Sequence, residues 1–486
     1  METNIFERAR SHFDNGIKFY NNSEYELAES EFIKSLQLVP DRLSTISNLI
    51  KIYIKNEEKI KLEDLLKKFN NLKNEKEILF GLAYKEYFNS KYKDSIDICN
   101  LLLNFKEIEL EVLDLLASNH KKTKNFLFAL KIYKIILQKN RNHFETYYNI
   151  GELLFELGKT KQAYFFFKKS YNVNKNNIAT LWNMSLCALT LKDFNNGFLL
   201  YETRWRRKNF QIKKFTHIKL ANNINDIYNK KILIWDEQGL GDTIQFSRFV
   251  IYLLKYTNDV TFVVNKRLKD LFSYLDSRIK VLDYESLNQA IFDFQLPICS
   301  SPNLLKISNI KEIPYYKLDL PKSVGKVDVI NKNKLNIGLA WSGNPNYPND
   351  EYRSIPLKNF YNLLSYKNVN FYKLFKDLRV SELFDFNSYN IKDFGEKNFL
   401  DLSYVIKELD LVISADTSII HLCGILGVNS ILLLNFNSDW RWFDDDKTTI
   451  WYPSVKIIKQ KEFNNWHKVF EELIKELKNT YKEKFF

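Results

Sequence analysis

Glycine and proline are scarce in this chain, and their scarcity argues against a turn-rich β fold. The 486 residues include only 13 glycines and 9 prolines, whereas 45% of them are hydrophobic and 15% are aromatic. A protein of many short strands needs more turn residues than this, whereas a protein of long helices does not. The apolar content also argues against disorder. Because the chain is longer than one hydrophobic core usually supports, we expect two or three domains.

Clustered cysteines and long apolar segments are also missing. Cys99, Cys187, Cys299 and Cys423 lie far apart without a CxxC pair, so we expect neither a disulfide framework nor a zinc site. The polar N-terminus, residues 1–15, lacks the apolar core of a secretory signal. No stretch approaches the ~20 apolar residues that a transmembrane helix needs. The sequence therefore predicts a cytoplasmic protein without a transmembrane segment.

The formal net charge is +13, which raises the question of an anionic partner. The lysines, however, are scattered among acidic and amide residues, and basic clusters such as residues 204–208 are short. No zinc-finger, RNA-recognition or basic-zipper pattern accompanies them. We therefore expect solvated lysine-rich surfaces and no nucleic acid, with attraction to an anionic substrate or peripheral contact with a membrane left open.

Residues 1–203 contain a sequence repeat. Small residues recur every 34 positions, at Ser95, Ala129, Ala163 and Gly197. Large residues fall at matching offsets, and only residues 43–76 fit poorly. This pattern resembles the tetratricopeptide repeat, whose paired helices need small residues where they approach closely. The resemblance implies a solenoid of stacked helix pairs with a groove that binds a protein partner.

A different pattern follows the repeats. Residues 204–230 are polar and lack a clear period, so we predict a linker there. Short apolar runs then alternate with helical segments, and we expect strands at 231–235, 260–264, 279–284, 335–341, 369–375, 410–415 and 430–436. This alternation is typical of parallel sheets. We predict two Rossmann-like lobes, residues 231–325 and 326–486, with ligands bound between them beyond the carboxyl ends of the strands.

The first candidate site segment lies at the turn after the strand expected at 231–235. It reads Glu237-Gln238-Gly239-Leu240-Gly241-Asp242. The glycines would let the backbone approach a ligand. Asp242 would lie at the start of the following helix, where a carboxylate also serves as an N-cap. Both interpretations of Asp242, catalytic carboxylate and helix cap, are consistent with the sequence.

The second segment, Asp416-Thr417-Ser418 with His421, also joins a strand end to a helix start. Free N–H groups and the helix dipole make such a position attractive to phosphate. Asp416 is better suited to sugar hydroxyls, because it repels an anion. Alternatively, Asp416 is a helix cap and His421 packs on the helix.

The third segment runs from Ser342-Gly343 to Arg353, eleven residues after Ser342. A small-residue turn with an arginine could hold a diphosphate, although an isolated arginine is more often solvated. Lys373 and Lys376 are secondary candidates for phosphate contacts. The run Asp444–Asp446 superficially resembles a metal site, but we expect a solvated turn. The amphipathic segment 462–486 predicts a terminal helix packed across the lobes.

These segments agree with a family pattern. Residues 231–249, 338–357, 409–427 and 438–460 together resemble the glycosyltransferase domain of the lipopolysaccharide heptosyltransferase family. The resemblance covers roughly residues 230–470 and is strongest to bacterial members with tetratricopeptide repeats in front. It implies a GT-B fold and a metal-independent, inverting transfer from a nucleotide-sugar donor to a protein or glycan acceptor, without a cofactor.

The resemblance also implies roles for individual residues. Asp242 matches the aspartate that is proposed as general base, with Glu237, Gln238, Gly239 and Gly241 on the acceptor side or in the loop. The donor-binding set would be Ser342, Gly343, Arg353, Asp416, Thr417, Ser418 and His421. Tyr347 departs from the histidine that relatives often have. The alternative function is a repeat-based interaction scaffold whose transferase-like domain binds nucleotides without activity.

Overall fold

The computed structural model describes residues 2–105, 110–208, 210, 214–287, 291–309, 311, 315–321, 333–345, 350–375, 378–395, 397–444 and 447–482. The chain forms two compact units. The first comprises Met1–Leu153 and Asn172–Lys175, and the second comprises Leu154–Tyr171 and Asn176–Phe486. The predicted lobe boundary at 325–326 lies outside the described residues, as do Tyr347, Lys376, Asp445 and Asp446.

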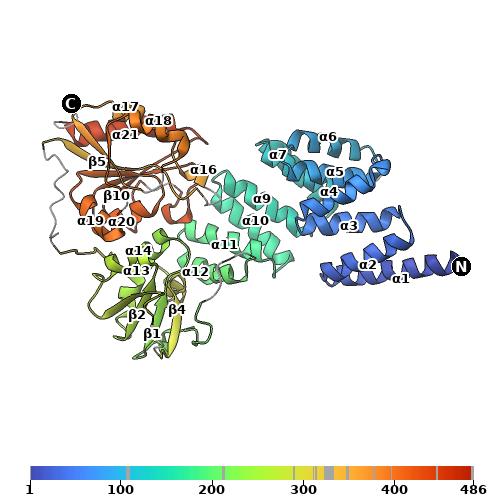
Figure 1. Ribbon diagram of the computed structural model, residues 1–486, viewed down its shortest axis with the longest axis horizontal. Helices are drawn as coiled ribbons and strands as arrows, with labels where there is room; N and C mark the ends of the chain where they lie inside the picture. The colour runs from blue at the N-terminus through green and yellow to red at the C-terminus, as the bar shows by residue number, and fades with distance from the viewer. Residues whose placement is uncertain are drawn as a thin grey trace. The chain divides into compact units, whose positions relative to one another are not determined.

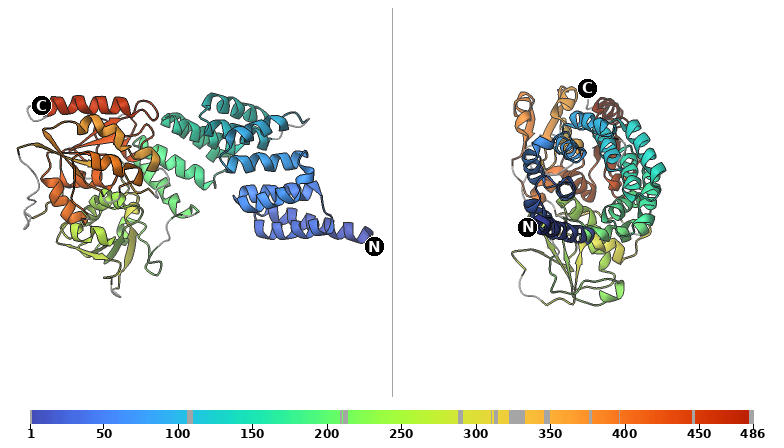
Figure 2. Two further views of the ribbon diagram at one scale, coloured as in Figure 1. Left: turned by 45° about the horizontal axis from the view of Figure 1, so that its top comes forward. Right: turned by 90° about the vertical axis from the view of Figure 1, so that its right-hand side faces the viewer.

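The first half of the chain is a series of helix pairs (Figures 1 and 2). The pairs are α1 (Glu2–Asn21) with α2 (Tyr25–Leu38), α3 (Leu43–Lys55) with α4 (Lys59–Lys68), α5 (Lys76–Phe88) with α6 (Tyr92–Leu102), α7 (Leu110–Lys122) with α8 (Phe126–Lys139), α9 (Phe144–Glu156) with α10 (Thr160–Val173), and α11 (Ile178–Thr190) with α12 (Phe194–Tyr201). The predicted repeat of helix pairs is confirmed. It includes residues 43–76, where the sequence pattern is weak.

Small residues and a recurring turn explain the pairs. Ala129 and Ala163 are fully buried, and a Cβ atom on Gly16 would lie 2.6 Å from the Phe32 ring. Between the two helices of each pair, one residue has a positive φ, and these residues are Ser23, Glu57, Ser90, Lys124, Gly158 and Lys192. Because they recur at 33- or 34-residue intervals, each pair is closed by the same left-handed turn. Glu57 shows that the degenerate repeat has this turn too.

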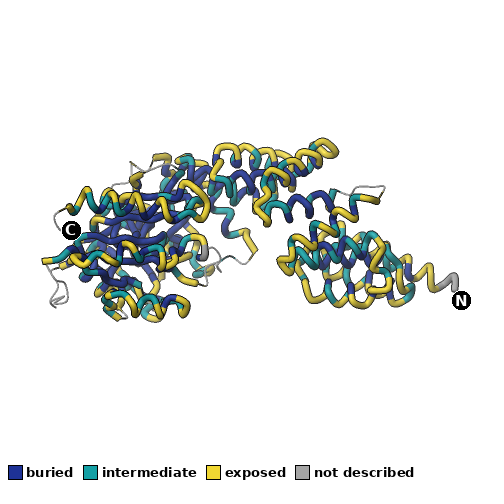
Figure 3. Tube along the Cα trace, turned by 90° about the horizontal axis from the view of Figure 1, so that it is seen from above, coloured by how far each residue is buried: buried dark blue, intermediate teal, exposed yellow. Residues whose placement is uncertain are grey.

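The second unit contains two parallel sheets. The first has the order β3-β2-β1-β4 and consists of β1 (Ile232–Trp235), β2 (Val260–Val264), β3 (Ile279–Asp283) and β4 (Phe294–Pro297). The second has the order β10-β9-β8-β5-β6-β7 and consists of β5 (Leu335–Ala340), β6 (Val369–Lys373), β7 (Ile391–Asp393), β8 (Leu411–Ser414), β9 (Ser430–Leu434) and β10 (Val455–Lys459). The central strands β1, β2, β5, β8 and β9 are buried along their whole length (Figure 3).

Helices lie in most of the connections between these strands. They are α13 (Leu240–Leu253), α14 (Lys266–Phe272), α15 (Ser301–Leu304), α16 (Asp350–Arg353), α17 (Tyr361–Leu364), α18 (Leu383–Ser388), α19 (Phe399–Lys407) and α20 (Ser418–Leu426). Between β9 and β10 the described residues form only the 3₁₀ helix η8 (Trp440–Trp442). The terminal helix α21 (Trp466–Thr480) packs Phe470 and Leu473 into the core of the second sheet. In the described residues its apolar face therefore belongs to one lobe, not to both as the sequence suggested.

Residues 204–230 are not the solvated linker that their polarity suggests. Arg204 and Ile227 are fully buried, and the Ala221 N–H donates a hydrogen bond to the Gln295 carbonyl of β4. This segment is thus part of the second compact unit. Among the described residues, no helix is both long and apolar enough to cross a membrane.

The repeat packing predicts the effect of a core substitution. Phe32→Ala should lower the free energy of unfolding by about 3–5 kcal/mol, because it removes a fully buried ring and leaves a cavity against Gly16. Urea unfolding followed by circular dichroism measures this change. Phe6→Ala, at a position that is 62% exposed on α1, serves as the control and should have little effect. Equal effects of the two substitutions would contradict the packing described for Phe32.

Candidate functional site

Asp242 lies in the first turn of α13. Its Oδ2 accepts a hydrogen bond from the Gly239 N–H at 2.8 Å, so it caps the helix that follows β1. The cap interpretation is therefore confirmed. The same carboxylate has a second partner, because its Oδ1 accepts a hydrogen bond from Arg441 Nη2. The side chain remains 20% exposed, so it is neither sealed in the core nor free in solvent.

The second segment forms the start of α20. Thr417 is the N-cap, and its Oγ1 accepts a hydrogen bond from the Ile419 N–H at 3.3 Å. Asp416 precedes this cap at the carboxyl end of β8, and Ser418 is the first helical residue. Ser418 and Asp416 are partly exposed, whereas Ile419 and Ile420 are buried.

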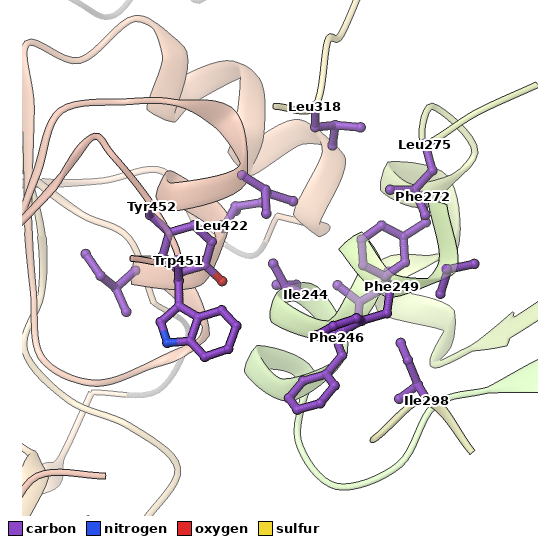
Figure 4. Packing of buried hydrophobic residues seen from close by; sticks show 14 of the residues in the cluster. Ile244, Phe246, Phe249, Phe272, Leu275, Ile298, Leu318, Leu422, Trp451 and Tyr452 are labelled. Atoms are coloured by element: carbon purple, nitrogen blue, oxygen red, sulfur yellow. The ribbon is translucent and has the colours of Figure 1, made fainter. Parts of the chain in front are cut away.

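The N-termini of α13 and α20 lie against each other. A Cβ atom on Gly241 would lie 2.9 Å from His421 Cδ2 and 3.5 Å from Ser418 Cα, so only glycine fits at this position without a shift. Apolar residues continue the contact, because Ile244 and Phe249 of α13 share one hydrophobic core with Leu422 of α20 (Figure 4). The first and second predicted segments are thus brought together, although they are far apart in sequence.

Arg441 connects α13 to the segment between β9 and β10 through charged and polar contacts. Its Nε donates a hydrogen bond to Gln245 Oε1 at 2.6 Å, and its Nη1 donates to Asp439 Oδ1 at 2.7 Å. With the bond to Asp242, the guanidinium binds two residues of α13. Arg441 is only 6% exposed, so water screens these interactions weakly.

The third segment joins the second through Arg353. Its Nη1 donates a hydrogen bond to the Asp416 carbonyl at 3.3 Å, and its Nε donates to Asp350 Oδ1 at 2.9 Å. A Cβ atom on Gly343 would overlap the Arg353 guanidinium, which explains the glycine. Ser342 is 4% exposed, and its Oγ has no hydrogen-bond partner within the described part of the chain.

Burial changes the pKa values of the titratable groups in this region. Burial and the neighbouring Asp439 carboxylate raise the pKa of Asp416 to about 6. Burial, together with Arg441 and Arg248, lowers the pKa of His421 well below its usual value, so the ring is neutral at neutral pH. Burial opposes the charge of Arg441, but Asp439 and Asp242 raise its pKa well above the usual value.

His421 has a packing role in this arrangement. Its Nδ1 lies 2.9 Å from the Tyr452 hydroxyl, and its ring stacks on Trp442 with a centroid distance of 5.2 Å. The other edge of the ring faces Gly241. A neutral, 4% exposed histidine with these neighbours supports the turn at Gly241 and is poorly placed for direct phosphate binding.

Two residues predicted on the acceptor side are engaged elsewhere. Glu237 is 1% exposed and forms a two-bond ion pair with Arg204, with both N···O distances 2.8 Å. Gln238 exchanges hydrogen bonds with the Tyr201 hydroxyl at 3.0 and 3.1 Å. Both side chains therefore stabilise the turn through contacts with Tyr201 and Arg204, at the end of the last helix pair. The secondary candidate Lys373 likewise forms an ion pair, 2.8 Å from Asp393.

Sequence reasoning missed three charged residues that organise this region: Arg441, Arg204 and Asp350. Asp350 is 3% exposed and binds both Arg353 and Arg379. Arg441 lies between two tryptophans, in Trp440-Arg441-Trp442, and this aromatic setting is the one local sign of a buried cation. The partners of Arg204 and Arg441 are distant in sequence, so local spacing does not reveal them.

The arrangement can attract an anion and hold a hydroxyl group. The N-termini of α13 and α20 supply positive potential near the carboxyl ends of β1 and β8. The guanidinium groups of Arg353 and Arg441 add positive charge there. The Ser342 hydroxyl and the partly exposed Ser418 add hydrogen-bonding groups near them. Asp242 and Asp416 are carboxylates that accept hydrogen bonds from hydroxyl groups. The combination is suited to a polar ligand that carries both phosphate and hydroxyl groups.

Comparisons with known proteins concern the repeats. No family model matches the chain. A protein named as TPR repeat-containing in Methanocaldococcus jannaschii is 20% identical over 233 residues, which are 46% of this chain. The match spans 40% of that relative, less than half of its length.

Solved structures with similar helical parts include Pseudomonas aeruginosa PilF and a thermophilic TPR protein of Thermus thermophilus. PilF is 14% identical and matches 42% of this chain and 93% of its own, with a TM-score of 0.34. The Thermus protein is 12% identical and matches 37% of this chain and 99% of its own, with a TM-score of 0.34. The helix pairs and the turn that recurs in them are of the tetratricopeptide type.

The contacts of Arg441 predict a large loss of stability when the cation is removed. Arg441→Met should lower the free energy of unfolding of the second unit by about 3–5 kcal/mol, because Asp242 and Asp439 lose their cation in a poorly solvated place. Thermal and urea unfolding both measure this. Arg278→Met, at an exposed arginine paired with Asp276, is the matched control and should change little. A loss no larger than that of the control would show that the contacts of Arg441 with α13 do not stabilise the second unit.

Proposed function

We propose that this protein is a repeat-based interaction protein whose α/β part binds a nucleotide sugar and transfers the sugar to a hydroxyl group of a protein or glycan acceptor. The helix pairs support the first half, because such solenoids present a continuous surface to peptides and proteins. One observation carries the second half. The turn that contains Asp242 packs against the start of α20, where Asp416 and Ser418 lie.

In this proposal the α/β part has the GT-B arrangement of two Rossmann-like lobes. Two parallel sheets in one compact unit support it. Ligands of such sheets bind beyond the carboxyl ends of the strands. Asp242 follows β1 and Asp416 follows β8, so both belong to such ends.

The proposed reaction is a single displacement. The acceptor oxygen attacks the anomeric carbon, the bond from that carbon to the diphosphate oxygen breaks, and the nucleoside diphosphate leaves with the electron pair. Asp242 takes the proton of the acceptor hydroxyl as the new bond forms. Attack opposite the leaving group inverts the anomeric centre.

Positive groups stabilise the leaving diphosphate. Arg353 contacts the backbone of Asp416, so its guanidinium lies beside the N-terminus of α20. The N–H groups of that terminus and the Thr417 and Ser418 hydroxyls are fixed donors, and fixed donors stabilise developing negative charge without reorganisation. The proposed reaction therefore uses protein cations in place of a metal ion.

A second candidate function has one specific observation in its favour. Both oxygens of Asp242 already accept hydrogen bonds, from Gly239 and Arg441. A carboxylate that is held by two structural contacts fits a scaffold whose α/β part binds nucleotides without transferring sugar. Turnover measurements decide between the two functions.

Asp242→Asn tests the catalytic role. We expect sugar transfer, or donor hydrolysis when the acceptor is unknown, to fall about 100- to 10,000-fold, because the amide cannot take a proton. Donor affinity should stay within a few-fold, since asparagine still caps α13. The measurement uses the purified full chain with a panel of nucleotide sugars, with product detected by mass spectrometry.

Asp270→Asn, at an exposed position of α14, is the control and should leave turnover unchanged. Equal turnover by wild type and Asp242→Asn would remove Asp242 from the reaction. Binding of a nucleotide sugar by wild type without any turnover would establish the second candidate function.

The raised pKa of Asp416 predicts a pH dependence of donor binding. Its carboxyl group gains a proton as the pH falls through about 6, which removes a negative charge beside the proposed phosphate position. Affinity for a nucleotide sugar should therefore increase by about 3- to 10-fold between pH 7.5 and 5. Titration calorimetry at several pH values measures this.

Asp416→Asn should bind with an affinity that no longer depends on pH in this range. A nucleotide sugar is the appropriate probe, because a free terminal phosphate titrates near pH 6 itself. The same pH dependence in wild type and Asp416→Asn would contradict the assignment.

A further inference from the structure

The last helix pair of the repeats contacts the turn that carries Asp242. Directly after α12, Arg204 lies in the 3₁₀ helix η2 (Glu202–Arg206) and is fully buried. Its guanidinium binds both oxygens of Glu237, at 2.8 Å each. Glu237 begins the turn between β1 and α13.

The Arg204 guanidinium is held from several sides. Its Nη2 also donates a hydrogen bond to Ser300 Oγ at 2.6 Å, and its Nη1 donates to Glu202 Oε1 at 2.8 Å. Although burial alone would lower its pKa, the adjacent Glu237 carboxylate raises it. Burial raises the pKa of Glu237, and the Arg204 guanidinium opposes that shift. A buried ion pair tolerates little displacement, because separating the charges leaves each without solvent or partner.

Tyr201 reaches the next residue of the same turn. Its hydroxyl exchanges hydrogen bonds with the Gln238 amide. Gln238 has a φ of 62°, a left-handed conformation that a non-glycine residue adopts at some energetic cost. The side-chain hydrogen bonds to Tyr201 stabilise this conformation. The conformation of Gln238 in turn sets the positions of Gly239 and Asp242, which come later in the same turn.

The same helix also contacts the other lobe. The Phe198 and Tyr201 rings lie 6.1 and 6.2 Å from the Trp440 ring, measured between centroids. Trp440 immediately precedes Arg441, which holds Asp242. Helix α12 therefore contacts Gln238 and Trp440. These two residues are close in sequence to Asp242 and Arg441, respectively.

We propose that the last repeat, α11 and α12 with η2, is a structural part of the site: Tyr201 and Arg204 position the 237–242 turn and thereby Asp242. These are positioning residues that contact the turn and not the substrate. The assignment of Asp242 as base rests on the proposed function, whereas the positioning of the turn does not. In this proposal the repeats have two roles. The earlier helix pairs are available to a partner, whereas the last pair is a structural part of the α/β unit.

Hydrogen–deuterium exchange of the full chain tests the positioning directly. Tyr201→Phe removes one hydroxyl and keeps the ring, so the protein should fold. Exchange of peptides covering residues 236–245 should accelerate by up to about tenfold, the effect of one lost hydrogen bond. Exchange of residues 260–272, which form β2 and α14 of the same sheet layer, should stay unchanged.

Two further variants sharpen the test. Arg204→Lys keeps the charge but loses the two-bond geometry, and it should accelerate exchange in the same segment. Tyr228→Phe, at a position that is 61% exposed, is the matched control without effect. Unchanged exchange at 236–245 in both site variants would overturn the proposal. An equal acceleration at 236–245 and 260–272 would also overturn it, because it would indicate general destabilisation.

Kinetics provide the readout that a purely structural role would not change. In Tyr201→Phe, kcat should fall about 10- to 100-fold while the KM for the donor stays constant, because the proposed donor contacts lie on α20 and α16. Local acceleration of exchange with unchanged kcat would overturn the link to Asp242. If wild type transfers no sugar, the proposed function fails, and the exchange data still decide whether Tyr201 and Arg204 position the turn.

Discussion

The buried guanidinium of Arg441 is the interaction on which the candidate site depends. It lies between β9 and β10, strands of the second sheet, and binds Asp242 and Gln245 of α13, the helix that follows β1 of the first sheet. A buried cation requires anionic partners, so this one constraint fixes the distance between the start of α13 and the segment around Trp440. Gly241 of the same helix also lies close to His421 of α20. The start of α13 is therefore held by Arg441 and packed against α20.

Arg441 also limits what the site can do. Its guanidinium already binds one oxygen of Asp242, so a substrate hydroxyl would share that carboxylate with it. In the proposed reaction, the anionic group of the substrate would compete for the positive charge of Arg441. A diphosphate has this property, and Arg353 beside Asp416 would bind the same group.

The parts of the fold that follow from local periodicity could be predicted from the sequence. The spacing of Ser95, Ala129 and Ala163 predicts the helix pairs, because small residues recur where helices touch. The turns inside the pairs were less visible, since Ser90 and Lys124 take the left-handed conformation in place of glycine. Strands β4, β7 and β10 were missed, because polar residues interrupt the apolar pattern that marks the central strands.

The sequence segments that form the candidate site could be predicted, whereas the contacts between these segments could not. Gly241, Asp242, Asp416 and Thr417 were identified because a strand end followed by a helix start is a local pattern. The ion pair of Glu237 was not predicted, because its partner Arg204 lies 33 positions earlier, in a stretch whose polarity suggested a linker.

The burial of Arg204 changes how the two halves of the chain are related in function. A polar linker would let the repeats carry a partner without affecting the α/β part. A fully buried Arg204–Glu237 pair instead makes the last helix pair inseparable from the turn before Asp242, because its removal would leave a buried carboxylate unpaired. The last helix pair, α11 and α12, is therefore better understood as part of the α/β domain's own structure than as part of an appended tether.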